Sequence, residues 1–354
     1  MEYVNTQAAL DAIAERVRTA TVVGFDTEFL REKTYHPKLC LAQLNLDGDI
    51  VIVDPLAALD YESAWTALCS AEWTLHAGRQ DLEVMRGTTA QLPRRIYDTQ
   101  IAAGLAGLPP QAGYATLVDE LCQIRLAKAH TRTDWSRRPL AAAVLDYAAD
   151  DVEYLPRVRH SLHETLDRHG RTAWLEEDCA ALLNPDLYTL DMASAWQRVK
   201  GLGRLPTEVQ QRAAALAGWR ERTADQRDLP RQWVLKDDAL IALAFANPGS
   251  AGDMANLQGV GRKFADRHSG QVLKVLGGEL PPPPEFRPRP DDEEKALTKA
   301  LGKVVREAAL SLNVEPEIIA AQKELRRLAA GARDVRVLSG WRDGLVGDAL
   351  RALL

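Results

Sequence analysis

The sequence predicts an α/β domain followed by two all-α modules. Strand and helix patterns alternate over the first half of the chain, whereas no convincing strand pattern follows about residue 190. Residues 281–290 hold six prolines and therefore predict a semi-rigid, extended linker between the two helical stretches. We expect domains at residues 1–190, 191–280 and 291–354, with the linker between the last two.

Short segments of opposite periodicity make up the predicted α/β domain. Apolar residues at helical spacing predict a helix over residues 10–17, and the three segments that follow alternate like strands. Because short turns join these three strands, we expect an antiparallel meander. The expected strands are 22–29, 39–46, 50–53, 73–75 and 96–98, with helices at 61–70, from about 81, and over most of 100–180 apart from a polar loop at 128–138.

Turn-forming residues divide the second half of the chain into several predicted helices. The breaks fall at 201–203, 228–230, 247–249 and 259–261. Four of the eight tryptophans lie in this half, and we expect most of them in the core, with base stacking as the alternative. These are Trp196, Trp219, Trp233 and Trp341.

The composition is that of an ordinary globular protein, with 354 residues of which 46% are hydrophobic and 27% charged. The longest apolar run, 239–246, is far shorter than the roughly 20 residues of a membrane helix. The N-terminus has no signal-peptide core, and the four cysteines lie far apart without a CxxC pair. We therefore expect a cytoplasmic monomer with no membrane partner, no disulfide framework and no zinc cluster.

Charge is distributed unequally along the chain, although the net charge is only −6. Residues 1–195 carry 18 Lys and Arg against 29 Asp and Glu, whereas residues 196–354 carry 26 against 21. An acidic half joined to a basic half indicates separate roles for the two. The basic half favours a polyanionic partner such as a nucleic acid.

Asp26 and Glu28 stand two residues apart in an apolar strand, so both side chains are expected on one face of the sheet. Two neighbouring carboxylates repel each other and lose hydration, and a divalent cation with oxygen ligands removes that cost. An edge strand that shows its acids to water is an equally good explanation of this pair.

Two further acidic segments are individually less specific. Asp81 lies where a strand leads into a helix, and the apolar residues around it do not settle whether Asp81 or Glu83 points inward. Tyr147 and Asp151 are four residues apart and share a helical face, with Asp150 one residue off it. Each segment alone is also typical of solvated acids on a helix surface.

Taken together, Phe-Asp-Thr-Glu-Phe at 25–29, His-Ala-Gly-x-x-Asp-Leu-Glu at 76–83 and Tyr-x-x-x-Asp at 147–151 resemble the three exonuclease motifs of the DEDD superfamily, tyrosine subtype. The flanking segments resemble bacterial ribonuclease D, and this resemblance spans essentially the whole chain. The flanks are 30–35, 97–100 and 131–140; residues 216–277 resemble an HRDC helical domain, and 338–342 the end of a second one. One departure is the segment 127–130, Ala-Lys-Ala-His, where the family has a more acidic stretch.

The resemblance implies a ribonuclease H-like exonuclease domain followed by two HRDC-like helical domains. It also implies that Tyr147 orients or helps to deprotonate the attacking water, and that two divalent ions, Mg²⁺ or Mn²⁺, are bound by Asp26, Glu28, Asp81 and Asp151. Two metal ions about 4 Å apart stabilise charge on both the entering and the leaving oxygen of a phosphodiester. The implied reaction is 3′-to-5′ hydrolysis from the 3′ end of RNA, such as a tRNA precursor.

Other functions remain open from the sequence. The same metal site would serve a DNA 3′–5′ exonuclease, and an inactive nuclease fold would serve as a nucleic-acid tether, although the intact set of acids argues against the tether. Thr27 and Phe29 are weaker candidates for contacts to the terminal nucleotide, with a place in the core as the alternative. His76 is expected to be a satisfied strand-end histidine, and Asp98 either a supporting acid or a helix N-cap.

Overall fold

The computed structural model describes residues 1–126, 133–189, 191–287 and 289–354, so the departure at 127–130 lies outside the described residues. The chain forms two compact units. The first comprises Met1–Phe29, Leu39–Tyr188 and Arg289–Leu354, and the second comprises Leu30–Lys38 and Thr189–Pro288. These units group the segments differently from the predicted domains, and the predicted boundaries stay a prediction.

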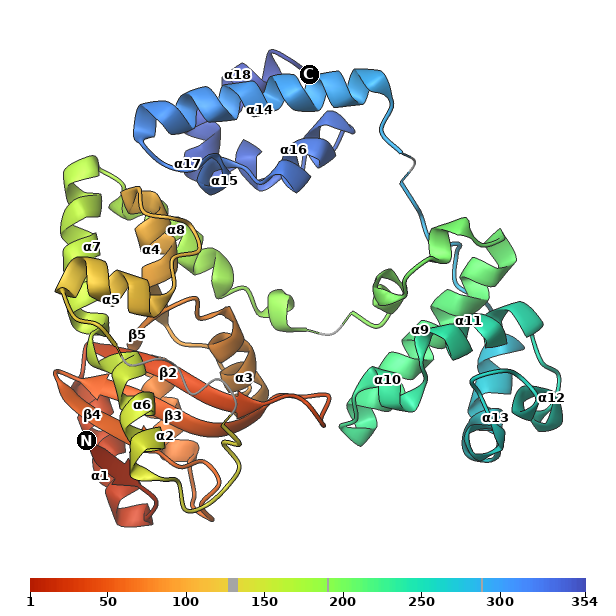
Figure 1. Cartoon of the computed structure of the whole chain (residues 1–354), viewed down its shortest axis with the longest axis horizontal. Helices are drawn as coiled ribbons and strands as arrows, with labels where there is room; N and C mark the ends of the chain where they lie inside the picture. Colours follow the sequence, from red (N-terminus) through yellow and green to blue (C-terminus); the bar gives the residue numbers. More distant parts are fainter. Residues whose placement is uncertain (127–132, 190, 288) are drawn as a thin grey trace. The chain divides into compact units, whose positions relative to one another are not determined.

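A mixed sheet forms the centre of the first unit, with the strand order β1-β4-β3-β2-β5-β6 (Figure 1). Neighbours β3 and β4 are antiparallel, whereas β1 is parallel to β4, and β5 is parallel to both β2 and β6. The five predicted strands are present; β1, with three residues, is too short to show the alternation that would have predicted it. The strands are β1 (Glu2–Val4), β2 (Val22–Leu30), β3 (Lys38–Leu46), β4 (Asp49–Val53), β5 (Glu72–Leu75) and β6 (Arg95–Asp98).

Eight helices belong to the same α/β part of the described chain. Thr6 caps the first of them, accepting a hydrogen bond from the backbone N–H of Ala9, and Asp98 caps α4 in the same way. The helices are α1 (Gln7–Thr19), α2 (Glu62–Ser70), α3 (Arg79–Thr89), α4 (Thr99–Ala106), α5 (Tyr114–Cys122), α6 (Ala142–Glu153), α7 (Leu155–His169) and α8 (Thr172–Leu182); a 3₁₀ turn, η1 (Pro185–Tyr188), follows.

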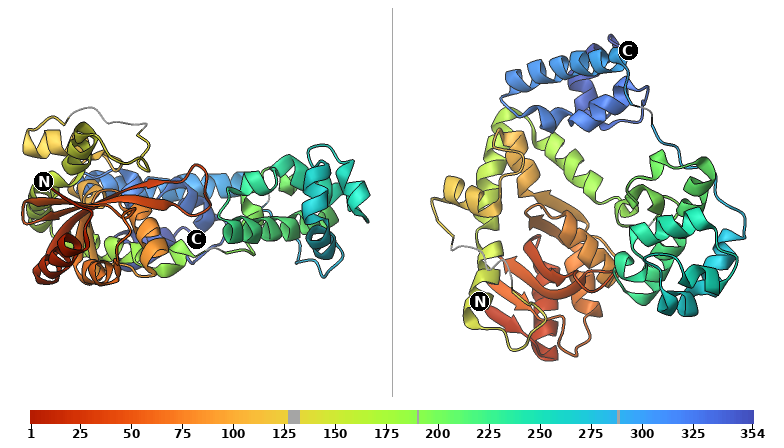
Figure 2. Two further views of the ribbon diagram at one scale, coloured as in Figure 1. Left: turned by 90° about the horizontal axis from the view of Figure 1, so that it is seen from below. Right: turned by 45° about the vertical axis from the view of Figure 1, so that its right-hand side comes forward.

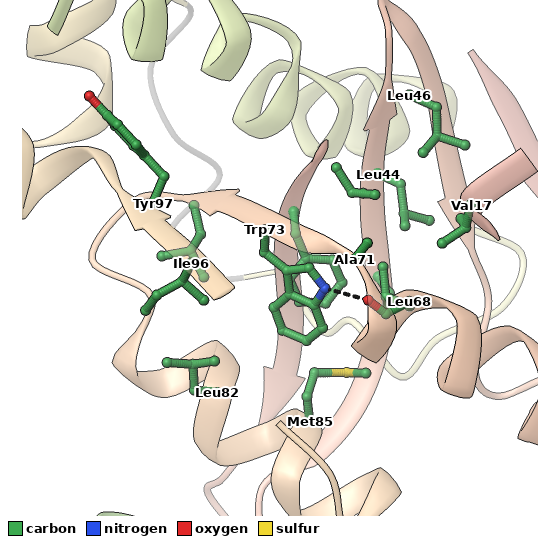
Figure 3. Close-up of a cluster of buried hydrophobic side chains, with 14 of the residues drawn as sticks. Val17, Leu44, Leu46, Leu68, Ala71, Trp73, Leu82, Met85, Ile96 and Tyr97 are labelled. Carbon is green, nitrogen blue, oxygen red and sulfur yellow. Dashed lines mark hydrogen bonds between the residues drawn. The ribbon is translucent and has the colours of Figure 1, made fainter. Parts of the chain in front are cut away.

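The core beneath one face of the sheet is built around Trp73 of β5 (Figure 3). Its ring lies 4.1 Å from that of Phe25, and its indole N–H donates to the carbonyl oxygen of Leu68 in α2, at 2.8 Å. Met85 of α3 lies in the same cluster. Because Phe25 is buried on this face, its neighbours in β2 are directed to the opposite face.

The C-terminal helices of the first unit have their own small core and also contact α8. The rings of Trp174 and Trp341 stack with centroids 4.3 Å apart, and Arg342 forms a buried ion pair with Asp178 at 2.6 Å. These helices are α14 (Asp292–Leu312), α15 (Pro316–Ile319), α16 (Gln322–Ala329), α17 (Gly340–Arg342) and α18 (Asp348–Arg351), with a 3₁₀ turn η4 (Arg336–Leu338) and a π turn η5 (Asp343–Gly347).

Between residues 191 and 287 the second unit contains helices and no strand, as the sequence predicts (Figure 2). The helices Thr207–Arg227 and Asp237–Ala246 end at predicted breaks, where Asp228 and Asn247 adopt left-handed backbone angles, whereas a 3₁₀ turn, Leu202–Arg204, lies at the break predicted over 201–203. Trp219 is buried in the core of this unit, but Trp233 is 62% exposed and does not follow the core expectation. The elements are η2 (Ala195–Arg198), η3 (Leu202–Arg204), α9 (Thr207–Arg227), α10 (Arg231–Val234), α11 (Asp237–Ala246), α12 (Ala251–Ala255) and α13 (Arg262–Leu276).

The segment Leu30–Lys38 between β2 and β3 belongs to this helical unit. The Tyr35 hydroxyl donates to Glu221 at 2.6 Å, and the backbone N–H groups of Tyr35 and His36 both donate to Asp228.

Across the ranges described, none of the helices combines the length and apolarity that a membrane span requires.

Candidate active site

Three of the predicted ligands converge on one face of the sheet. Asp26 and Glu28 come from β2 and Asp151 from α6, and one carboxylate oxygen of each lies within 4.8 Å of the others. Phe25 packs on the opposite face, as the strand alternation requires. The acids of β2 therefore share a face that a helix covers, rather than lining an edge open to water.

Asn45 of β3 holds α6 over this face. Its side-chain amide donates to the carbonyl oxygens of Val152 and Glu153 at 3.0 and 3.1 Å, at the end of the helix that carries Asp151. Gly24 makes room for Asn45, because a Cβ at residue 24 would lie 2.8 Å from the Asn45 Cβ. The position of Asp151 thus depends on a glycine and an asparagine that carry no catalytic chemistry.

Asp81, in the first turn of α3, is 6% exposed and accepts a hydrogen bond from the Thr27 hydroxyl. Glu83 is more exposed, so the structure places Asp81, and not Glu83, inward. Asp81 lies outside the group of three closest acids, yet its charge acts on the pKa values of Asp26 and Glu28. Thr27 is buried against this acid, and a contact with a nucleotide stays a prediction for it and for half-buried Phe29.

Asp98 fixes the turn that delivers Asp81. One of its oxygens caps α4 by accepting from the backbone of Gln100, and the carboxylate also accepts from the N–H groups of Ala77 and Gly78, just before α3. The N-cap explanation of Asp98 is thus confirmed, with an added function in the β5–α3 turn.

His76 is half-buried directly after β5. Its Nδ1 is 2.9 Å from the Thr99 hydroxyl, and burial lowers its pKa.

Tyr147 lies one helical turn before Asp151 and is hydrogen-bonded to it. Burial and the neighbouring acids raise the pKa of its hydroxyl, so the group is neutral near pH 7 and acts as a hydrogen-bond donor. The ring of Trp135, which is 6% exposed, lies 6.3 Å from that of Tyr147 and supports it.

Arg138 anchors the loop that carries Trp135, and sequence reasoning missed it as a supporting residue. Its guanidinium makes two 2.6 Å bonds to Asp54 and further bonds to the carbonyl oxygens of Cys40 and Trp135. In the sequence, the run Asp-Trp-Ser-Arg-Arg-Pro stands out only through the family resemblance. An arginine in a polar loop carries no local signal of a buried partner 84 positions away.

Burial and repulsion from neighbouring acids raise the pKa of all four predicted ligands. Burial is the largest cause at each: the pKa of Asp26 stands well above its ordinary value, and those of Glu28, Asp151 and Asp81 are raised to about 8, 7 and 6. Coulombic repulsion from Asp81 and Asp151 adds to the shift at both acids of β2.

A set of oxygen ligands with these properties fits a hard divalent cation such as Mg²⁺ or Mn²⁺, which stabilises the ionised form. Asp150 differs from the four predicted ligands. Its pKa is raised by burial and by Glu153 and Asp146, which are its neighbours on α6, and it is absent from the group of closely spaced oxygens.

Comparison with known proteins supports the family resemblance over nearly the whole chain. Residues 1–167 match the 3′-5′ exonuclease family and residues 209–276 the HRDC domain. Ribonuclease D of Granulibacter bethesdensis is 36% identical over 97% of this chain and 90% of that protein; that of Gluconacetobacter diazotrophicus is 36% identical over 99% and 92%.

A solved structure agrees. Escherichia coli RNase D, an exoribonuclease involved in structured RNA processing, matches with a TM-score of 0.89 at 28% identity, over 100% of this chain and 98% of that chain. The expected ribonuclease H-like domain followed by an HRDC domain is thereby confirmed, while the HRDC-like character of residues 291–354 stays a prediction. Relatives of this similarity and coverage establish that the chain belongs to the ribonuclease D family.

Proposed function

We propose that this protein is a divalent-metal-dependent enzyme that removes nucleotides from the 3′ ends of structured RNA, tRNA precursors among them, in the cytoplasm. Membership of the ribonuclease D family supports the reaction class. The observation that carries the metal dependence is the convergence of Asp26, Glu28 and Asp151 on one helix-covered face.

Asp26, Glu28, Asp81 and Asp151 would hold two divalent ions. When bound, such ions supply stabilisation of the charge that develops on the entering and leaving oxygens of the phosphodiester. Thr27 fixes the Asp81 carboxylate through its hydroxyl. The neutral hydroxyl of Tyr147 is hydrogen-bonded to Asp151, and its oxygen would orient the attacking water for displacement.

We further propose that the helical parts bind the body of the RNA. The exonuclease half is acidic and cannot by itself hold a polyanion well, because bound cations offset repulsion only over about 8 Å at physiological salt. On the C-terminal helices, a groove of about 270 Å³ runs between α14 and α16. Four basic residues line it, against one acid, Glu294: Lys295, Lys299, Arg306 and Arg326.

The test uses one RNA hairpin with a single-stranded 3′ tail, labelled at either end. With Mg²⁺ or Mn²⁺ we expect the 5′-labelled RNA to shorten stepwise and the 3′ label to leave at once as a mononucleotide; with EDTA both should persist. Internal products, or full activity in excess EDTA, would contradict the proposal. A DNA of the same sequence separates the second candidate, a DNA exonuclease, and no cleavage of either would favour a tether.

A further inference from the structure

Gln43 of β3 is a buried amide without a protein partner. The residue has no solvent exposure, and neither its Nε2 nor its Oε1 is hydrogen-bonded. Among the residues that the structure describes, it is the only amide side chain in this state. Buried polar groups in proteins are nearly always paired, so an unpaired one requires an explanation.

The register of the sheet places Gln43 opposite Asp26. β2 and β3 are neighbours, and the connection over 31–37 is too short for a parallel crossover, so the two strands are antiparallel. The contact between Gly24 and the Asn45 Cβ pairs residue 24 with residue 45. In an antiparallel pair, moving two residues from this position along each strand brings Asp26 opposite Gln43. The Cβ atoms of residues in such a cross-strand pair are about 5 Å apart.

Both side chains lie on the face that α6 covers. Asn45, two residues from Gln43, is bonded to the end of α6, and Asp26 lies close to Asp151 of the same helix. Strand alternation puts Gln43 on the side of Asn45. A glutamine side chain is long enough for its amide to span the cross-strand separation of about 5 Å to the Asp26 carboxylate.

We propose that Gln43 is a positioning residue of the metal site, whose Nε2–H donates to the Asp26 carboxylate. The inference rests on the proposed function. Carboxylates that bind metals are themselves held by hydrogen bonds from neighbouring groups, and losing such a group weakens metal binding by about 10- to 100-fold. An apolar residue would fill the same space without an unpaired amide, so packing does not account for a glutamine.

Titration of the full chain with Mn²⁺ by calorimetry, without RNA, tests the role directly. Gln43→Met keeps the length of the side chain and loses the amide. We expect its Mn²⁺ affinity to fall by about tenfold or more, while the melting temperature of the EDTA-treated protein stays equal or rises. Leu44→Met, on the next residue and the opposite face, is the matched control and should keep wild-type affinity.

Two outcomes overturn the role: wild-type Mn²⁺ affinity in Gln43→Met, or an equal loss in Leu44→Met. If Gln43→Met fails to fold, Gln43→Leu replaces it under the same criteria, and Gln43→Asn, which keeps a shorter amide, should fall between Leu and wild type. Failure of the proposed function is distinct, since it appears in the wild type as no Mn²⁺ binding and no RNA degradation. Wild-type protein that binds and cleaves, together with an unaffected Gln43→Met, rejects only the role of Gln43.

Discussion

Two buried carboxylates of the first unit, Asp54 and Asp26, have surroundings that shift their pKa values in opposite directions. Asp54 receives two bonds from Arg138 and one from the Tyr3 hydroxyl, all at 2.6 Å. Although burial acts to raise it, these bonds hold the pKa of Asp54 below its ordinary value. Asp26 is gathered instead with other acids, and its pKa stands well above the ordinary value.

The difference separates a structural acid from an acid kept for a ligand. Asp178 resembles Asp54 in its pairing, since both of its oxygens are bonded to Arg342, at 2.6 and 2.8 Å, although burial raises its pKa. A chain that can pair two buried aspartates with arginine has the means to neutralise a third. Where it collects several acids on one face instead, the missing positive charge is best supplied by a bound cation.

The largest effect should come from Asp26→Asn. We expect RNA hydrolysis to fall by about 10³-fold or more, because a metal ligand is lost and the metal supplies several kcal/mol of transition-state stabilisation. The melting temperature in EDTA should equal or exceed that of wild type, because repulsion is relieved. Asp54→Asn is the comparison: its melting temperature should fall. Wild-type turnover by Asp26→Asn would contradict the view that Asp26 binds a metal ion whereas Asp54 is a structural acid.

Arg342→Met should have the next largest effect, on stability. It leaves Asp178 buried with its main partner removed, and breaking a buried pair costs about 3 kcal/mol. Denaturation by urea measures the loss. Arg327→Met removes an exposed pair with Asp334 and should cost less than about 1 kcal/mol. Equal losses in the two variants would show that burial does not decide the value of these pairs.

Tyr147→Phe should slow hydrolysis by about 10²-fold while retaining Mn²⁺ binding, because the ring packing against Trp135 survives and only the hydroxyl is lost. Asp151→Asn should lose metal affinity as well, and Asp150→Asn should be mild. Kinetics and calorimetry on the three variants assign the roles. A severe Asp150→Asn with a mild Asp151→Asn would mean that the wrong face of α6 was assigned to the site.

Much of this arrangement was predictable because it rests on local geometry. Strand alternation alone places Asp26 and Glu28 on one face, and helical spacing places Tyr147 beside Asp151. The choice of Asp81 over Glu83 needed the structure, since it depends on where Thr27 lies. Neither the ion pair of Arg138 with Asp54 nor the proposed contact of Gln43 with Asp26 could be predicted from the sequence, because no local pattern encodes a pairing between residues so far apart.

Glu28 and Asp151 should also respond to pH in the opposite way to Asp54. An acid whose pKa is higher in the folded than in the unfolded state stabilises the fold at low pH, and this stability is lost as the pH rises through the folded value. For Glu28 and Asp151 that window lies between about pH 5 and 8. The EDTA-treated protein should therefore melt a few degrees lower at pH 8.5 than at pH 5.5, and Mn²⁺ should reverse the loss.

Asp54 has a lowered pKa, so its stabilisation is present above about pH 4 and disappears only below it. Asp54 therefore does not make the stability depend on pH between pH 5.5 and 8.5. In EDTA, Glu28→Gln should flatten the dependence of the melting temperature on pH. Asp54→Asn should lower the melting temperature without changing this dependence between pH 5.5 and 8.5. A wild-type melting temperature that rises with pH would contradict the assignment of raised pKa values to the acidic cluster.

The smallest expected effect concerns the basic groove of α14 and α16, to which we have assigned RNA binding as a proposal. Removing all residues after about 195 would also strip Trp341 and Arg342 from α8, so loss of binding and loss of fold would be confounded. Neutralising Lys299 and Arg306 together avoids this. We expect RNA affinity to fall several-fold. The slope of log affinity against log salt concentration should decrease by about one unit for each phosphate that the variant no longer neutralises.

Lys303→Ala is the matched control, because Lys303 is on the same helix, is paired with Glu307 and does not line the groove. An unchanged affinity and salt slope in the double variant would place the RNA grip elsewhere, whereas equal losses in Lys303→Ala would mean that total charge matters and the groove does not.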